Sequence, residues 1–431
     1  MFHFSTPRRM QLKTPIWRLV TVLALCIGNF DAVSAQPLQQ PPPPPPLQMH
    51  QAANTRGGIV FHCEARQLPI LQEAVGSYLA ELGMDPTWIA RDVDEEHGVV
   101  SYTIATEVAS NGTLELSDQS RWGLTEELVK LPADPTTKKA AERTVITVSK
   151  KEIVLAMLQP GRTTQFGARA CDVQALKDHV GIRQNIVAWT ETLIWRWPDG
   201  GPARWNNVYW RRGTPLKRVP LHVAVNDAFI NQKRYSIGCY TATKLVMIQG
   251  VLDYFNRVKQ DPATLKLVEA QLERGGEPLS FIEPGAMWEF ESDITAADIA
   301  RPGKLLGMVH GVPANHFIPG DWSYFLNTDA STYAKTGYEG SNAVYLGRGK
   351  FDDFYEDHHH YYTYKEKLNE VYQWRNKVFS ASRDVALVKP LSAKDFERIM
   401  TTPAQGGIVL DLRVFPLQFG YQDLPDHAFL Q

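Results

Sequence analysis

Residues 235–248, YSIGCYTATKLVMI, combine a cysteine with a helical pattern of apolar side chains. Gly238 interrupts the preceding segment, and apolar residues then recur at helical spacing from Leu245 to Phe255. The pattern places Cys239 at the start of a helix, where unpaired backbone N–H groups and the helix dipole favour a thiolate. Thiol nucleophiles use this arrangement. A buried structural cysteine or a disulfide partner is the alternative interpretation.

Three predicted strands follow this helix along the chain. Residues 316–327 (HFIPGDWSYFLN) contain a turn that leads into the first, residues 337–347 (GYEGSNAVYLG) form the second, and the third starts at 349–351. A helix that carries a nucleophile, followed by an antiparallel sheet that carries its base, is the layout of papain-type thiol enzymes. The predicted fold class is therefore α+β, with a papain-like core and an additional N-terminal α+β region.

The first half of the chain shows an α+β pattern of its own. The predicted elements are a strand at 57–63, a helix over 70–82 that ends at Gly83, a strand at 99–105 and a hairpin turn at Asn111-Gly112. Residues 132–142 are rich in Pro, Lys and Thr, which is typical of a linker. We place the end of the N-terminal region (57–160) after this segment and assign 161–431 to the catalytic domain. A further helix is predicted over 173–189.

The N-terminus has the pattern of a secretory signal peptide. Four basic residues precede an apolar run over 19–27, and the small residues Val33 and Ala35 precede a predicted cleavage before Gln36. An uncleaved anchor is the alternative, although the run is shorter than the about 20 residues of a transmembrane helix. We expect residues 1–35 to be removed and the protein to be exported to the periplasm, the cell envelope or the medium. Residues 36–56, with six consecutive prolines, then form a linker.

The composition is that of a folded globular protein and excludes several function classes. The 431 residues carry a net charge of −2, or −5 once residues 1–35 are removed. The chain therefore lacks the excess of basic residues that would indicate a nucleic-acid partner. Four cysteines are too few for a disulfide-built scaffold. Three remain after export; we pair Cys63 with Cys171 and leave Cys239 free, although the sequence alone does not fix this connectivity.

Five short motifs fall in one order along the chain: RQNIVA at 183–188, YWR at 209–211, CYTA at 239–242, PGDWSYF at 319–325 and GSNAVYLG at 340–347. Their order and spacing resemble those of the bacterial spore-coat protein-glutamine gamma-glutamyltransferases (transglutaminases) over residues 172–375. The resemblance implies a papain-like core that works without a metal or other cofactor. It makes Cys239 the nucleophile that attacks a glutamine side-chain amide, releases ammonia and passes the acyl group to a lysine amine. The implied partners are proteins or peptides with Gln and Lys side chains.

The sequence departs from this family at two positions. The glutamate that precedes the family's cysteine is replaced by Gly238, and the family's second glutamate falls on Ser341, a poor base. Glu339 would share a strand face with that position, so it is one candidate base or orienting group, with a solvated edge residue as the alternative. His360, in an acidic and histidine-rich cluster over 352–360, is the other candidate base. A metal site or a solvated loop are the alternative interpretations of that cluster.

Tryptophans are frequent between residues 189 and 210. Core packing accounts for such residues, and a stacking surface for sugars or peptides is the alternative; we expect Trp210 and Trp322 to contact substrate. The preferred function is an exported transglutaminase-like acyltransferase associated with the cell envelope. A thiol amidase or peptidase that acts on cell-wall peptides and a catalytically inactive binding module are the other hypotheses. No pattern in the sequence indicates an oligomeric state.

Overall fold

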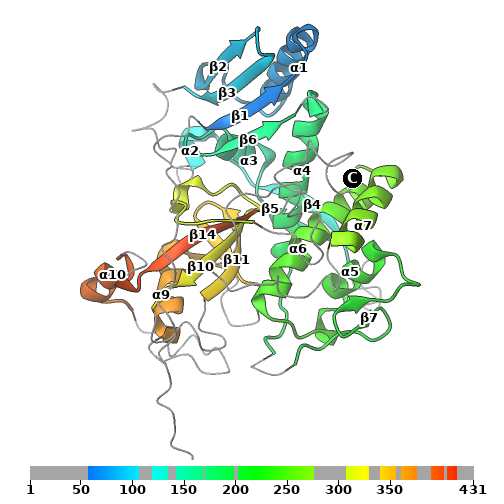
Figure 1. Cartoon of the computed structure of the whole chain (residues 1–431), viewed down its shortest axis with the longest axis vertical. Helices are drawn as coiled ribbons and strands as arrows, with labels where there is room; N and C mark the ends of the chain where they lie inside the picture. Colours follow the sequence, from blue (N-terminus) through cyan, green and yellow to red (C-terminus); the bar gives the residue numbers. More distant parts are fainter. Residues whose placement is uncertain are drawn as a thin grey trace, which may run out of the picture. The chain divides into compact units, whose positions relative to one another are not determined.

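The computed structural model describes residues 57–105, 119–133, 142–167, 170–198, 202–275, 307–329, 340–355, 361–375, 390–401 and 405–414. These residues form a mixed arrangement of helices and sheets, so the α+β class is confirmed (Figure 1). The predicted signal peptide, the proline-rich linker and the Asn111-Gly112 turn lie outside the described residues.

The N-terminal region is built on a four-stranded sheet. Its order is β2 (Ile89–Asp94), β3 (Val99–Ile104), β1 (Gly58–His62) and β6 (Thr163–Phe166), and helix α1 (Leu68–Glu81) accompanies it. β1 is antiparallel to β3 and parallel to β6. The predicted strands at 57–63 and 99–105 and the helix over 70–82 are thereby confirmed. The helix ends at Glu81 with Leu82 as its C-cap, and the next residue is Gly83, whose φ of +68° suits a residue without a Cβ atom.

Most of the following elements are helices and short hairpins. They are α2 (Gln119–Trp122), β4 (Glu127–Pro132), β5 (Glu142–Thr147), α3 (Lys150–Met157), α4 (Val173–Thr190), β7 (Trp210–Arg211), β8 (Thr214–Pro215), α5 (Leu221–Ile230), α6 (Cys239–Asp253) and α7 (Pro262–Gly275). The helix predicted over 173–189 is confirmed as α4. β4 and β5 pair with each other, so the segment predicted to be a linker joins two strands of one hairpin.

Helices α4 and α6 pack closely because a glycine lies between them. A Cβ atom on Gly250 of α6 would come within 2.1 Å of the Ile186 side chain of α4. α6 has buried residues on all sides, as expected for a helix in the centre of a core. This packing fixes the course of the helix that begins at Cys239.

The C-terminal part is a six-stranded antiparallel sheet. Its order is β13 (Tyr362–Thr363), β12 (Lys350–Asp352), β11 (Gly340–Gly347), β10 (Trp322–Asn327), β14 (Ile408–Val414) and β9 (Gly307–Val309), with helices α9 (Tyr364–Arg375) and α10 (Ala393–Ile399). The three strands predicted after Cys239 are confirmed as β10, β11 and β12. Figure 1 shows β10, β11 and β14 side by side. One face carries Trp322 and Val344 in the core that includes α6, and the other carries Phe325 and Ala343 against Leu368 of α9.

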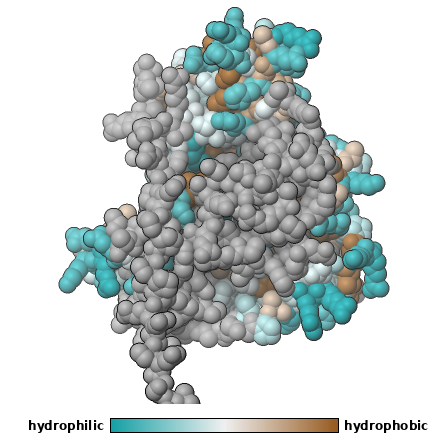
Figure 2. Space-filling view, in the orientation of Figure 1, coloured by the Kyte–Doolittle hydropathy of each residue, from teal (hydrophilic) through white to brown (hydrophobic). Residues whose placement is uncertain are grey.

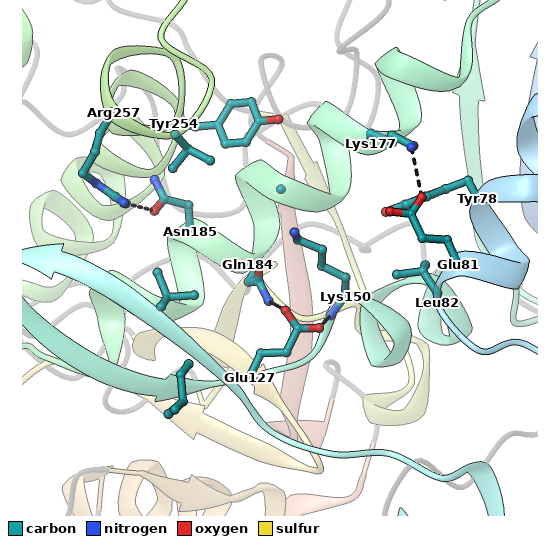
Figure 3. A pocket seen from close by; sticks show the side chains of 14 residues that line it. Tyr78, Glu81, Leu82, Glu127, Lys150, Lys177, Gln184, Asn185, Tyr254 and Arg257 are labelled. Atoms are coloured by element: carbon teal, nitrogen blue, oxygen red, sulfur yellow. Dashed lines mark hydrogen bonds and ion pairs between the residues drawn. The ribbon is translucent and has the colours of Figure 1, made fainter.

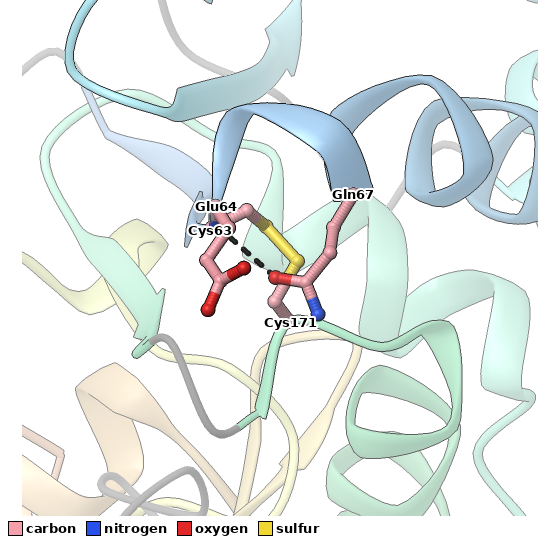
Figure 4. Close-up of a disulfide and its surroundings, with 4 residues drawn as sticks. All are labelled: Cys63, Glu64, Gln67 and Cys171. Carbon is pink, nitrogen blue, oxygen red and sulfur yellow. Dashed lines mark hydrogen bonds between the residues drawn. A yellow bond between two sulfur atoms is a disulfide. The ribbon is translucent and has the colours of Figure 1, made fainter.

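A disulfide between Cys63 and Cys171 joins the N-terminal sheet to the start of α4 (Figure 4), as predicted. Cys63 follows β1, and Cys171 precedes Asp172, which caps α4 by accepting a hydrogen bond from the Gln174 N–H. The disulfide closes a loop of 108 residues. It therefore connects the N-terminal sheet, which contains none of the five motifs, to α4, which contains the motif RQNIVA.

On the face drawn in Figure 2 the described residues are mostly hydrophilic, with hydrophobic ones scattered between them. Among the described ranges, no helix combines the length and the apolar character needed to cross a membrane.

Glu152 is a buried carboxyl group that connects α3 to the turn between β11 and β12. Only 2% of the residue is exposed, and its Oε1 accepts a hydrogen bond of 2.9 Å from the Arg348 N–H. Burial raises the pKa of Glu152 to about 7, and the nearby charge of Arg348 opposes the rise. The folded protein therefore holds a proton here at pH values where an unfolded glutamate has lost it.

Replacing both cysteines of the disulfide should destabilise the fold. The double variant Cys63→Ser, Cys171→Ser frees a long loop in the denatured state, so we expect the free energy of unfolding to fall by about 2–5 kcal/mol. Urea unfolding measures the loss. Cys239→Ser, which breaks no disulfide, is the control and should change stability by less than about 1 kcal/mol. Equal losses in the two proteins would contradict the prediction.

The variant Glu152→Gln should change the dependence of stability on pH. The stability contributed by the wild-type carboxyl is fully present below the unfolded pKa near 4.5 and is lost as the pH rises through about 7. Glutamine keeps an acceptor for Arg348 and carries no charge. We expect it to raise the free energy of unfolding by about 2 kcal/mol at pH 8 and to change little at pH 5. Urea titrations at both pH values test this, and a pH-independent difference would refute it.

Candidate active site

Cys239 is the first residue of α6, with Gly238 as the N-cap, and its thiol is free and half-buried. The sequence prediction of a cysteine at a helix N-terminus is confirmed. The backbone N–H groups of the first turn therefore point toward the region of the sulfur, and the positive end of the helix dipole lies there. Both features favour negative charge at this position.

Asn342 on β11 is the residue that contacts the sulfur. Its Nδ2 donates a hydrogen bond of 3.3 Å to Cys239 Sγ, and its Oδ1 accepts one of 2.9 Å from Trp322 Nε1. An indole N–H can only donate, so it fixes the amide with its oxygen toward Trp322 and its NH₂ group toward the sulfur. Trp322 thereby orients the donor that Cys239 meets.

A buried guanidinium lies among the aromatic rings beside these residues. Arg413 of β14 is 1% exposed, and its Cζ lies 4.3 Å from the ring centre of Tyr324, 4.8 Å from that of Tyr240 and 5.4 Å from that of Trp322. Tyr240 is the residue after Cys239 and meets the Trp322 ring edge-on at 5.2 Å. A fixed cation in a poorly solvated region stabilises negative charge that develops nearby.

The register of the sheet places the side chains of Asn342 and Ser341 on opposite faces. Asn342 lies opposite Tyr324, and Ser341 lies opposite Phe325. Residues opposite each other share a face and successive residues alternate, so Ser341 projects with Phe325 into the cluster that α9 covers. Its hydroxyl is buried and has no hydrogen-bond partner among the residues that the structure describes. The position that the resemblance assigns to a catalytic glutamate therefore faces away from Asn342.

The other predicted site residues do not meet at Cys239 within the described structure. Glu339 and His360 lie outside the described residues, so their roles stay predictions. Trp210 is 1% exposed and donates to the Ala224 carbonyl, which places it in the core rather than on a surface for substrate. Trp322 is also fully buried and acts on the site through Asn342. Among the described residues no carboxylate or imidazole is hydrogen-bonded to the sulfur.

A buried histidine–carboxylate pair lies farther along the same sheet. His310 Nδ1 is 2.9 Å from Asp411 Oδ2, and Asp411 lies opposite Tyr324. Burial raises the pKa of Asp411, and the hydrogen bond to His310 opposes the rise. Such a pair can transfer protons, but within the described part of the chain no hydrogen bond joins it to Cys239. Sequence analysis missed it because the two residues are separated by 101 positions and belong to no motif.

No group of three or more His, Cys, Asp or Glu side chains within the described ranges is arranged to hold a metal ion. The acidic and histidine-rich cluster over 352–360 is described only as far as residue 355.

Comparisons with known proteins identify the relatives of this site. A family model described as protein-glutamine gamma-glutamyltransferase matches residues 129–399, a range that contains Cys239, Trp322 and Asn342. Among solved structures, the transglutaminase from Geobacillus stearothermophilus (without its C-terminal extension) aligns at 17% identity, with a TM-score of 0.32, over 58% of this chain and 95% of that chain. No curated protein matches the chain.

Removing the amide of Asn342 should slow the reaction of Cys239 with alkylating agents. Asn342→Ala deletes the donor to Sγ, which favours the reactive thiolate, so we expect the rate with iodoacetamide at neutral pH to fall about tenfold, the loss typical of one hydrogen bond to a charged group. Trp322→Phe keeps the amide but frees its orientation and should cause a smaller loss. Ser341→Ala, on the other face, should leave the rate unchanged. A rate in Asn342→Ala equal to that of wild type would exclude the proposed contact.

Proposed function

The chain belongs to the protein-glutamine gamma-glutamyltransferase family, whose members are acyltransferases, and on this premise we propose that Cys239 forms a thioester from the side chain of a protein glutamine. The observation that carries the proposal is a free, half-buried thiol at a helix N-terminus that accepts a hydrogen bond from an oriented amide. Nucleophilic cysteines need this combination of accessibility and local stabilisation of the thiolate.

In the first half of the reaction the sulfur attacks the carboxamide carbon of glutamine. A C–S bond forms, the C–N bond breaks, and the nitrogen leaves as ammonia after it has gained a proton. Backbone N–H groups at the start of α6 are the donors that we propose for the carbonyl oxygen as it gains charge. The Arg413 guanidinium adds a fixed positive charge on the same side of the sheet.

In the second half a lysine amine attacks the thioester carbon. A C–N bond forms, the C–S bond breaks, and the amine loses a proton. The sulfur leaves as a thiolate, and the Asn342 N–H is placed to stabilise it in this step as in the ground state. Glu339 and His360, the candidates from the sequence, are the groups we propose for proton transfer in both halves.

Export of the protein is part of the same proposal. The signal-peptide pattern of residues 1–35 motivates it, and the Cys63–Cys171 disulfide supports it, because disulfides persist mainly in oxidising compartments. The substrates would then be proteins or peptides with Gln and Lys side chains outside the cytoplasm, at the cell envelope or beyond it.

A catalytically inactive module is the second candidate, and the absence of the family's two glutamates favours it. A Cβ atom added at Gly238 would have its nearest neighbour, the Trp197 ring, at 3.9 Å. Packing therefore does not require glycine there. The loss of the acid at this position is a chemical change that the surrounding structure does not explain.

Purified mature protein should incorporate a labelled primary amine into a glutamine-donor protein and release one ammonia for each amine. Mass spectrometry of the modified glutamine and an ammonia assay measure the two products. Cys239→Ala should lose both activities and keep its unfolding transition. Ammonia release without amine incorporation would identify a hydrolase, and a folded wild type with neither product would identify an inactive module.

A further inference from the structure

A pocket of about 550 Å³ opens at the end of α6 that lies away from Cys239 (Figure 3). Its walls come from α1, β4, the first residue of α3, α4 and the π-helical turn Tyr254–Val258 that continues α6. Cys239 begins α6 and Asp253 ends it, so the pocket and the thiol are separated by the helix length of about 20 Å. The pocket is therefore distinct from the site of the proposed acyl transfer.

Within the described ranges, the hydrogen bonds around the pocket leave one charged group of its lining without a partner. Both oxygens of Glu127 are hydrogen-bonded, because its Oε1 accepts from the Lys150 backbone N–H and its Oε2 from Gln184 Nε2. The Arg257 guanidinium is bound by Asp253, the Lys130 carbonyl and Asn185. The ammonium of Lys150 has no partner among the described residues.

Lys150 and Lys177 reach the same space. In Figure 3 the Lys150 side chain runs into the pocket between Gln184 and Lys177. The Lys177 ammonium lies 3.2 Å from Glu81 and 4.8 Å from the centre of the Tyr78 ring. The lining thus carries the carboxylates of Glu81 and Glu127 and the cations Lys150, Lys177 and Arg257, of which Arg257 pairs with Asp253 beside the pocket. The Lys150 ammonium is the one charge of the lining with no partner among the described residues, and an anionic group is its natural complement.

The remaining lining is apolar and aromatic. The Tyr254 ring lies directly against the backbone of α4, because a Cβ atom at Gly181 would come within 2.5 Å of it. Leu128 and Val258 line the pocket and are 70% and 50% exposed. Exposed side chains of this kind at the edge of a polar cavity indicate contact with the apolar part of a ligand.

Two further features indicate that the pocket is a built site. The turn over Tyr254–Val258 is π-helical, a conformation that is rare and is found disproportionately at functional sites. The volume of the pocket lies within the range of small-molecule binding sites. Because α1 supplies Tyr78 and Glu81 and its C-cap supplies Leu82, the N-terminal region outside the family match forms one wall of the pocket.

We infer that this pocket is a second ligand site, which binds a small organic carboxylate with an apolar or aromatic body. The carboxylate pairs with the Lys150 and Lys177 ammonium groups, and the body lies against Tyr254, Leu128 and Val258. The inference does not depend on the proposed function, because no residue of the acyl-transfer site lines the pocket.

The test uses the full mature chain and four probes: benzoate, phenylacetate, hexanoate and N-acetylphenylalanine. The primary amide of each probe and inorganic phosphate serve as comparisons. Ligand-observed NMR detects binding, and calorimetric titration gives the dissociation constant. At least one carboxylate should bind to wild type, whereas its amide and phosphate should bind at least tenfold more weakly.

Lys150→Gln should weaken binding of that carboxylate at least tenfold, and Lys177→Gln should weaken it less, because Glu81 already shares the Lys177 charge. Lys151→Gln is the matched control. Its ammonium lies 5.1 Å from the centre of the Trp88 ring and does not line the pocket, so this variant should bind within twofold of wild type. Absence of binding by all four carboxylates, or equal affinity in Lys150→Gln and Lys151→Gln, would overturn the inference. Stronger binding of phosphate than of any carboxylate would do the same.

Discussion

The carboxylate of Asp321 holds together the three parts of the fold on which the site depends. It accepts hydrogen bonds from Arg162, next to β6 of the N-terminal sheet, and from Arg183 of α4, whose Nη1 lies 2.8 Å away. Burial raises the pKa of Asp321, but the two guanidiniums outweigh it and hold the pKa below its usual value. Removing one member of a buried ion group leaves an uncompensated charge, which costs about 3–5 kcal/mol. Since Trp322 follows Asp321 directly, this ion group also places the indole that orients Asn342 toward Cys239.

Helix α4 acts as the central support because three successive residues bind three different elements. Arg183 binds Asp321 before β10, Gln184 donates to Glu127 of β4, and Asn185 donates to the Gly250 carbonyl and to Asp253 of α6. Trp189 adds a second donor to Asp253. α6 is therefore held at its C-terminus by α4 and contacted at its N-terminus by β11. The motif RQNIVA, which the sequence shows only as a string of residues, is the centre of this network.

The sequence predicted those features that depend on local pattern. Apolar periodicity located α4 and the helix of Cys239, and turn residues located β10, β11 and β12. It did not identify Asn342 as the contact of the sulfur, because a fully buried strand gives no alternation that distinguishes its two faces. The register with β10 decides which of Ser341 and Asn342 faces α6. Long-range pairs such as His310 and Asp411 are likewise set by strand order, which no spacing in the sequence reveals.

An amide beside the nucleophile has a definite chemical consequence. The Asn342 NH₂ group can donate to the sulfur and stabilise a thiolate, but an amide cannot take up a proton at neutral pH. The described site thus separates two tasks that a Cys–His pair combines: Asn342 and the α6 N-terminus position and stabilise the sulfur, and another group must move protons. In the second half of the proposed reaction the sulfur leaves as a thiolate, which needs no proton. In the first half the nitrogen must gain a proton to leave as ammonia, so the proton-transfer group is needed most there. Proton delivery to the leaving nitrogen is therefore the step for which we propose Glu339 and His360, and the step at which we expect the replacement of the family's two glutamates to matter most.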